Sequence, residues 1–366
     1  MKGTWKENEK LNVLEESCGH SAVWVPSISK VMVSGGFNKK SKHKTVRLLD
    51  EHVATSPHRA PVSMIYNFSH VAKNGKVYML GLLKKNGDKQ VLCYISYDPN
   101  MNKWSKTYAL DISSRVGFCA VSISDNVFLV FGGQDPKKKT ICNDTYRMNI
   151  GNDGKIKCTP LCSNRNSARA YASAAYDGAN RVWIFGGFTG KKNRSCNEMS
   201  VYNIISDTWK VIREDGAECW PSARVSSTLT SMRDPSKFLL YGGNAHHKKN
   251  NENRDGVFIF DSKNRTWKIL KSSRGNSTRI KGHSATLLPN GSVMFYGGHD
   301  GSSWSSAVFI LSLSDTNDDV KMKGAGVTTL LMKDVKTTIK QKRKSLHEHK
   351  NDDDDDDDDD YENSDP

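Results

Sequence analysis

Short apolar runs that end in a pair of glycines recur along this chain. In Val182 to Gly187, four β-branched or aromatic residues precede the pair. Such residues suit the pleated surface of a buried strand, and glycine allows the positive φ of a tight turn without steric cost. The first glycines of the six copies are Gly35, Gly81, Gly132, Gly186, Gly242 and Gly297. Their recurrence every 46 to 56 residues predicts one repeat architecture instead of unrelated domains.

The positions that follow the glycines are also repeated. The second glycine is Gly36, Gly133, Gly187, Gly243 and Gly298, and Leu82 replaces it in one copy. A second apolar segment then leads to a Tyr or Phe, an Asp or Asn that turns the chain, and a tryptophan at a fixed offset. These tryptophans are Trp104, Trp209 and Trp267, and we expect each ring to cap the next hairpin. With a further strand upstream of the glycines, each repeat offers four strands, which predicts an all-β chain.

Apolar run, glycine pair, turn and tryptophan together resemble the kelch repeat over residues 4–313. The resemblance implies a six-bladed β-propeller, with one four-stranded blade per repeat around a central channel. Ser56 and Lys155 stand where copies one and three would have tryptophan, and copy two has Leu82. We therefore expect blades one to three to be the least regular.

A propeller must close its ring, because an open ring exposes an unpaired strand edge. The N-terminal Thr4-Trp5-Lys6 repeats the Thr-Trp-Lys around Trp209 and Trp267. We predict that residues 4–14 form the outer strand of the sixth blade. The propeller would then occupy residues 1–314 and a flexible tail residues 315–366.

Charge divides the chain into two opposed parts. Residues 351–366 hold eleven acids and no Lys or Arg, so the overall net charge of +14 leaves +25 on residues 1–350. A strongly basic folded part favours acidic partners. The tail has helical spacing at Val327 to Ile339, a basic cluster at Lys340, Lys342, Arg343 and Lys344, and then nine aspartates. That aspartate run is disordered in isolation, and it is either a solubilising tail or a weak competitor for the basic face.

Four arginines precede the strand that leads to the glycines. They are Arg115, Arg169, Arg224 and Arg279, spaced by 54 or 55 residues. Equivalent positions in successive blades lie on one face near the channel mouth. Each arginine either holds a blade junction together through backbone carbonyls or a neighbouring acid, or takes part in an arc that binds an acidic partner through guanidinium–carboxylate bonds. In kelch-type adaptors, basic residues on such a face accept acidic peptides, which by resemblance favours partner binding.

The loops that follow the glycine pairs are basic and should share one rim. They are residues 38–44, 137–139, 191–194 and 246–254. These loops are either solvated or a contact surface for nucleic acid, anionic lipid or an acidic protein. They hold no aromatic residue for base stacking, which argues against nucleic acid.

Catalytic and metal-binding motifs are scarce. Cys158 and Cys162 have no second pair at zinc-finger spacing, and no nucleophile elbow or phosphate loop occurs. We expect no cofactor and a non-enzymatic, monomeric protein-interaction module. Two alternatives stay open by resemblance, since some kelch propellers are sugar-processing enzymes or copper radical oxidases and others bind actin.

The chain shows no signal for secretion or membrane insertion. Residues 1–11 are polar, and no apolar run is long enough to span a bilayer. The eight cysteines share no position in the repeats, which is typical of free thiols in a reducing compartment. We expect a cytoplasmic protein, and the basic cluster in the tail resembles a nuclear localisation signal.

Overall fold

The computed structural model describes most of the repeat region. The described residues are 2–8, 14–50, 54–84, 90–162, 168–190, 195–213, 219–244, 256–272 and 280–314. They belong to one compact unit, Met1–Asp315. The predicted tail, with its basic cluster and aspartate run, lies outside the described residues.

Six sheets, one per repeat, form the blades. Blade 1 has β2 (Cys18–Val25), β3 (Lys30–Phe37), β4 (Thr45–Leu49) and β5 (Ala54–Arg59), with the 3-10 helix η2 (Pro26–Ile28) between the first two strands. Blade 2 has β6 (Ile65–Val71), β7 (Val77–Lys84), β8 (Gln90–Asp98), β9 (Lys103–Trp104) and β10 (Tyr108–Ala109). Blade 3 has β11 (Cys119–Ser124), β12 (Val127–Phe131), β13 (Thr145–Ile150) and β14 (Ile156–Leu161).

The remaining blades follow the same plan. Blade 4 has β15 (Ser173–Tyr176), β16 (Arg181–Phe185), β17 (Met199–Asn203) and β18 (Thr208–Ile212). Blade 5 has β19 (Thr228–Ser231), β20 (Lys237–Tyr241), β21 (Phe258–Asp261) and β22 (Thr266–Ile269). Blade 6 has β24 (Ser284–Leu287), β25 (Val293–Tyr296), β26 (Val308–Ser314), β1 (Lys2–Glu7) and the short β23 (Lys271–Ser272).

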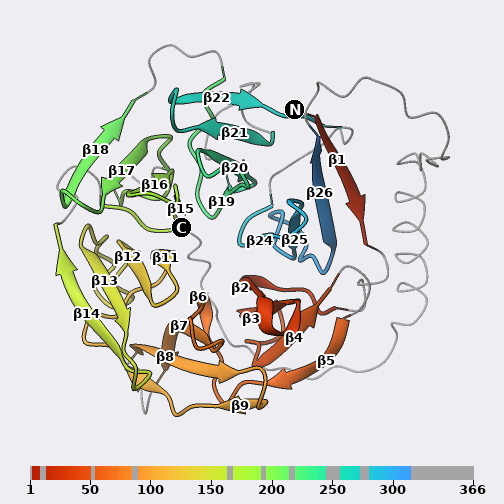
Figure 1. The fold of residues 1–366 in the computed structure, drawn as a ribbon, viewed down its shortest axis with the longest axis vertical. Coiled ribbons are helices and arrows are strands. Elements are labelled where there is room, and N and C mark those ends of the chain that lie inside the picture. The colour runs from red at the N-terminus through yellow and green to blue at the C-terminus, as the bar shows by residue number, and fades with distance from the viewer. Residues whose placement is uncertain are drawn as a thin grey trace, which may run out of the picture. The chain divides into compact units, whose positions relative to one another are not determined.

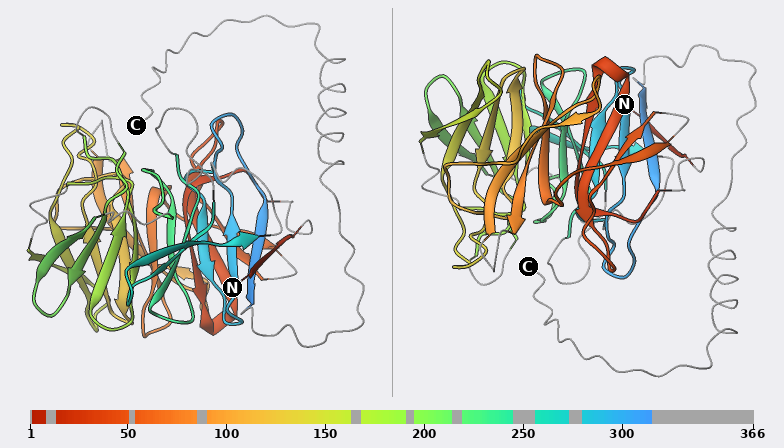
Figure 2. Two further views of the ribbon diagram at one scale, coloured as in Figure 1. Left: turned by 90° about the horizontal axis from the view of Figure 1, so that it is seen from above. Right: turned by 90° about the horizontal axis from the view of Figure 1, so that it is seen from below.

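The blades surround a central axis, with β2, β6, β11, β15, β19 and β24 innermost (Figure 1). Consecutive strands of a blade pair antiparallel, as in β16 with β17, where Arg181 faces Asn203 and Phe185 faces Met199. Side views show the strands running between two faces of the ring (Figure 2). The second strand of every blade carries the glycine position at or directly after its C-terminal part, so all glycine pairs lie on one face, which we call the diglycine face. These observations confirm the predicted six-bladed all-β propeller.

The N-terminal strand closes the ring. Strand β1 pairs antiparallel with β26, from Lys2 opposite Ser314 to Glu7 opposite Phe309, and parallel with β23. The pairing completes blade 6 as predicted, although the strand begins and ends earlier than the expected residues 4–14. Residues 9–13 lie outside the described residues.

The hydrophobic core is divided into six layers, each between two neighbouring blades. Met199 and Phe258 share the layer between blades 4 and 5, for example, and Phe128 and Leu80 share the layer between blades 2 and 3. Successive side chains along a strand point to opposite faces of the sheet, and apolar residues occur on both faces. Both faces are apolar because each blade is covered by a neighbouring blade on either side. Every blade is therefore stabilised mainly by contacts with the next blade.

The repeated tryptophans belong to these layers. Trp209 lies 4.8 Å, centroid to centroid, from Phe131 of blade 3, and Trp267 lies 5.2 Å from Phe185 of blade 4. Each partner is the aromatic residue directly before a glycine pair. The rings thus pack sideways onto the preceding blade, which corrects the expectation that they cap the next hairpin.

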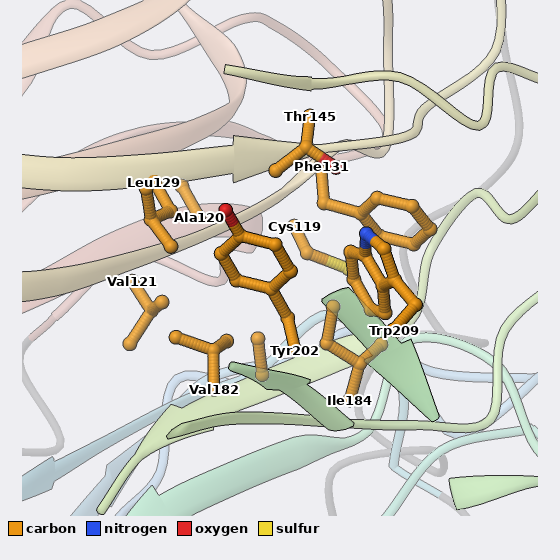
Figure 3. Close-up of a pocket in the computed structure, with 11 residues that line it drawn as sticks. Cys119, Ala120, Val121, Leu129, Phe131, Thr145, Val182, Ile184, Tyr202 and Trp209 are labelled. Atoms are coloured by element: carbon orange, nitrogen blue, oxygen red, sulfur yellow. The ribbon is translucent and has the colours of Figure 1, made fainter. Parts of the chain in front are cut away.

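Figure 3 shows the layer between blades 3 and 4, where a cavity of about 10 Å³ lies beside Trp209, Tyr202 and Cys119. This volume is at the lower limit for one water molecule. Burial raises the pKa of the Cys119 thiol to about 12, so it stays protonated at neutral pH. The cavity is a packing defect between blades and offers no nucleophile.

Blades 1 to 3 are the least regular, as predicted. Register shifts occur between Val46 and Leu48, between Ile65 and Phe68, and between Ser122 and Ser124, one in each of these blades. In blade 2, the outer position is split between the two-residue strands β9 and β10. Within the described residues, the ladders of blades 4 to 6 show no such shift.

Three histidines, His20, His70 and His283, are buried where neighbouring blades meet, and two of them have strongly lowered pKa values. His20 Nε2 lies 2.9 Å from Ser284 Oγ, and His283 Nε2 lies 3.0 Å from Thr228 Oγ1. Burial, followed by the nearby charges of Arg47 and His283, lowers the pKa of His20 to about 3. Burial lowers the pKa of His283 to about 4. Both side chains are therefore neutral in the folded ring over most of the acidic range.

Acid should weaken the propeller through these two histidines. In the unfolded chain both imidazoles bind a proton near pH 6.5, whereas in the folded chain they stay neutral down to about pH 4. The free energy of unfolding is therefore highest above pH 6.5 and decreases as the pH falls toward 4. Each histidine contributes a slope of about 1.4 kcal/mol per pH unit. Urea unfolding at about pH 7.5 and about pH 5 measures it. A His20→Gln/His283→Gln variant should lose this part of the slope, and an unchanged slope would contradict the assignment.

Candidate partner-binding face

The mouth of the channel on the diglycine face is framed by one residue from each blade. All six residues have positive φ: Gly19, Tyr66, Gly117, Tyr171, Ser226 and Gly282. Backbone hydrogen bonds link neighbours around the mouth, with Tyr171 N–H donating to Gly117 O at 2.6 Å and Gly282 N–H donating to Ser226 O at 3.1 Å. The corresponding bonds from Ser226 to Tyr171 and from Gly19 to Gly282 measure 2.8 Å each. We call these six residues the mouth ring.

Three of the predicted arginines, Arg115, Arg169 and Arg224, lie just outside the mouth ring, but their side chains point into the blades. Arg115 and Arg169 are fully buried and Arg224 is 1% exposed. Each guanidinium donates to the first glycine carbonyl of its own blade, at 3.1 Å for Arg115 with Gly132 O and 3.0 Å for Arg224 with Gly242 O. Arg115 also holds Asp144 through two bonds of 2.6 and 2.9 Å, and Arg169 is paired with Glu198.

The same arginines join neighbouring blades through their backbones. Gly133 N–H donates to Arg169 O at 2.8 Å, and Gly187 N–H donates to Arg224 O at 2.8 Å. A Cβ on Gly132 would lie 2.2 Å from Arg169 O. The close approach of the two blade backbones at this point therefore requires glycine at position 132. Direct partner contact by these guanidinium groups is therefore corrected to a structural role at the blade junctions, because a partner cannot reach side chains enclosed in this way.

The fourth predicted arginine, Arg279, lies outside the described residues. Its neighbour Ile280 accepts the bond from Gly243 N–H at 2.9 Å, as Arg169 and Arg224 do for their preceding blades. The bridge between Lys281 and His299 likewise matches that between Val225 and Asn244. Ile280 is thus the equivalent of the arginines in blade 6, and the spacing in the sequence placed this member one residue too early.

Two of the predicted basic loops are described, and both are compact turns. Asn38 Oδ1 accepts the backbone N–H groups of Lys40 and Ser41 at 2.9 Å each. In blade 3, Asp135 Oδ1 accepts those of Lys137 and Lys138 at 2.8 Å each. These capped turns hold several exposed lysines on the diglycine face, namely Lys39, Lys40, Lys42, Lys44, Lys137, Lys138 and Lys139. We call these residues the lysine rim. The basic loops 191–194 and 246–254 lie outside the described residues.

Aromatic side chains also gather on this face, which the sequence analysis missed. Five half-buried rings form a chain of contacts. The centroid distances are 4.8 Å for His299–Trp304, 5.3 Å for Trp304–Phe37, 5.5 Å for Phe37–Tyr66 and 5.3 Å for Tyr66–Tyr171. We call these five residues the aromatic stripe. One feature of the sequence could have indicated them: Tyr66 and Tyr171 occupy the repeat position that Gly19, Gly117 and Gly282 occupy in other blades.

A larger cavity, of about 330 Å³, lies between blades 1 and 6 at the opposite ends of the strands. Its lining is mostly apolar and includes Trp24, Leu49 and Met294. The ion pair of Lys30 with Asp50, at 3.1 Å, borders it. It is separate from the lysine rim and the aromatic stripe.

In the described part of the chain, no three His, Cys, Asp or Glu side chains gather where they could hold a metal ion. Among the same residues, no helix is both long and apolar enough to cross a bilayer.

Comparisons with known proteins agree with this geometry. Kelch domain-containing protein 3 of Rattus norvegicus and of Mus musculus are each 22% identical over 309 residues, which is 76% of this chain and of theirs. The tRNA wybutosine-synthesizing protein 4 of Saccharomyces cerevisiae is 33% identical over 120 residues, but these make up only 16% of that protein and 32% of this chain. The model of the Attractin/LZTR1 beta-propeller family matches residues 77–307, more than half of the chain. The chain belongs to the Attractin/LZTR1 β-propeller family.

Proposed function

We propose that this propeller is a non-enzymatic protein-interaction module whose diglycine face binds an acidic segment of a partner protein. The observation that carries the proposal is the lysine rim, in which capped turns from two blades hold exposed ammonium groups around one channel mouth. Preformed turns reduce the entropy that a partner must remove on binding. Lysine ammonium groups favour carboxylates without fixing their exact geometry.

The charge of the chain supports an acidic partner. The +25 carried by residues 1–350 should attract acidic segments and accelerate their association, more strongly at low salt. The fold provides a rigid ring, but a propeller alone does not identify a partner. The argument for binding therefore rests on the surface of the diglycine face.

Charge reversal on the lysine rim tests the proposal. A Lys39→Glu/Lys40→Glu/Lys137→Glu/Lys138→Glu variant should bind a fluorescent Asp/Glu peptide about tenfold more weakly or worse at low salt, because favourable pairs become repulsive. Fluorescence anisotropy over a salt series measures the loss. Since these side chains are exposed, the melting temperature should change little.

A variant with the same charge change elsewhere is the control. Lys73, Lys103, Lys263 and Arg265 are exposed and lie at hairpin turns on the opposite face. Reversing all four to Glu alters the net charge equally but leaves the lysine rim intact. If this control weakens binding as much as the rim variant, the peptide senses only net charge and the proposed face is wrong.

A further inference from the structure

The aromatic stripe is distinct from the core of the propeller. None of its five residues belongs to the six apolar layers between blades. Its rings come from blades 6, 1, 2 and 4 and follow one another across the mouth ring. Burial of apolar surface between blades, which explains the other clusters, does not explain this one.

Backbone strain at the tyrosines supports the same distinction. Tyr66 has φ of 49° and Tyr171 has φ of 56°, in the left-handed region that residues other than glycine rarely adopt. Glycine occupies the same position without strain in blades 1, 3 and 6. Strained residues that a fold could replace by glycine are concentrated at functional sites. The two rings are thus held at the mouth at a cost to stability.

Glycines of the mouth ring also make room for the stripe. A Cβ on Gly117 would lie 2.6 Å from the ring of Tyr171, and a Cβ on Gly19 would lie 2.9 Å from Phe37 and 3.2 Å from Tyr66. The rings therefore rest on the backbone of neighbouring blades. This packing lets Tyr171 of blade 4 pass over blade 3 and contact Tyr66 of blade 2.

The stripe runs into the lysine rim. Phe37 directly precedes the turn that carries Lys39 and Lys40, and it pairs across that turn with Lys42. On the same turn position of blade 6, Asp300 accepts the backbone N–H of Ser303 at 2.7 Å and is followed by Trp304. The part of the lysine rim in blade 1 thus begins directly beside the aromatic stripe.

From this juxtaposition, and resting on the proposed function, we propose that the aromatic stripe is the anchor site for a large apolar or aromatic side chain within the acidic partner segment. The anchor would pack on Trp304, Phe37 and Tyr66, while flanking carboxylates meet the lysine rim. Buried aromatic contacts supply most of the energy in many interfaces, and surrounding charges add orientation and speed of association. The partner motif is then an acidic peptide with one central Trp, Phe or Leu.

Two peptides and two variants separate this inference from the proposed function. One peptide contains Asp and Glu around a central Trp, and the other has Ser in place of that Trp. The full chain should bind the Trp peptide about tenfold more tightly. A Tyr66→Gly/Tyr171→Gly variant should lose this preference but keep its affinity for the Ser peptide, and the lysine-rim variant should lose affinity for both.

The glycine substitutions also test the structural alternative. Because glycine adopts positive φ freely, the double variant should melt at the same temperature as the original chain or higher. If the double variant unfolds, or if it retains the full preference for the Trp peptide, the stripe is structural and the inference is overturned. The proposed function is tested separately by the lysine-rim variant. If single-stranded oligo-dT displaces the Trp peptide, and if this displacement requires the two tyrosines, the inference is overturned and the stripe binds nucleic acid instead.

Discussion

An Arg169→Glu substitution should unfold the propeller or lower its melting temperature by about 10 °C or more. Arg169 is fully buried, where it donates to Gly186 O at 3.1 Å and to Glu198 O at 2.9 Å and pairs with the Glu198 carboxylate. A glutamate there would place a second carboxylate against carbonyl oxygens that have lost their donor. Burying such an unpaired charge costs about 4 kcal/mol or more, a large part of the 5 to 15 kcal/mol by which a typical domain is stable.

Two further substitutions make this result specific. Arg169→Lys keeps the charge but cannot reproduce the forked donor geometry, so it should have an intermediate melting temperature. Arg213→Glu makes the same charge change on the surface of the same blade and should alter stability by no more than about 0.5 kcal/mol. Circular dichroism during heating measures all three. An Arg169→Glu protein that melts normally but fails to bind acidic peptides would restore direct partner contact as the role of this residue.

Deletion of residues 1–7 should open the ring. The deletion removes the whole of β1, which pairs with β26 from Lys2 to Glu7, and with it Trp5, whose ring lies 5.2 Å from Tyr241 and 5.1 Å from Phe295. A fully buried tryptophan contributes about 3 to 5 kcal/mol, and loss of the half-buried Trp5 side chain should cost part of that free energy. The freed edge of β26 would also be available for pairing with other chains. We therefore expect a large loss of stability together with aggregation, visible by thermal unfolding and size-exclusion chromatography.

Complementation gives the sharpest control for this deletion. A synthetic peptide of residues 1–8 should restore the monomeric, folded protein in a concentration-dependent way, because it supplies the missing strand. Deletion of residues 351–366, which lie outside the blades' sequence, should leave the melting temperature unchanged. A chain without residues 1–7 that melts at the original temperature would show that β1 does not close the ring.

The glycine pairs and tryptophans made the architecture predictable from the sequence. Both sit where the repeat demands them, because Gly132 lies against a backbone carbonyl of the next blade and Trp209 against the blade before it. The irregular blades could be predicted for the same reason, since Leu82 and Lys155 break the repeated set. A packing constraint that recurs in each blade selects the same residue type at regular intervals in the sequence.

The candidate site was less predictable, because it depends on features without a period. Arg279 fits the spacing but not the register, since loop length between blades varies and shifts the equivalent position to Ile280. A spacing argument also could not show that the arginine side chains turn inward. Phe37 and Trp304 occupy repeat positions that differ from each other and from the one shared by Tyr66 and Tyr171, and these rings meet only when the ring of blades closes.

The mouth ring has a consequence for how such a face can diverge. Its hydrogen bonds, as from Ser226 N–H to Tyr171 O, connect backbone atoms, so they do not depend on which side chain each blade contributes. Glycine, tyrosine and serine are all accommodated at this position. Duplicated genes could therefore acquire new recognition properties by changing these few residues while the scaffold is inherited intact.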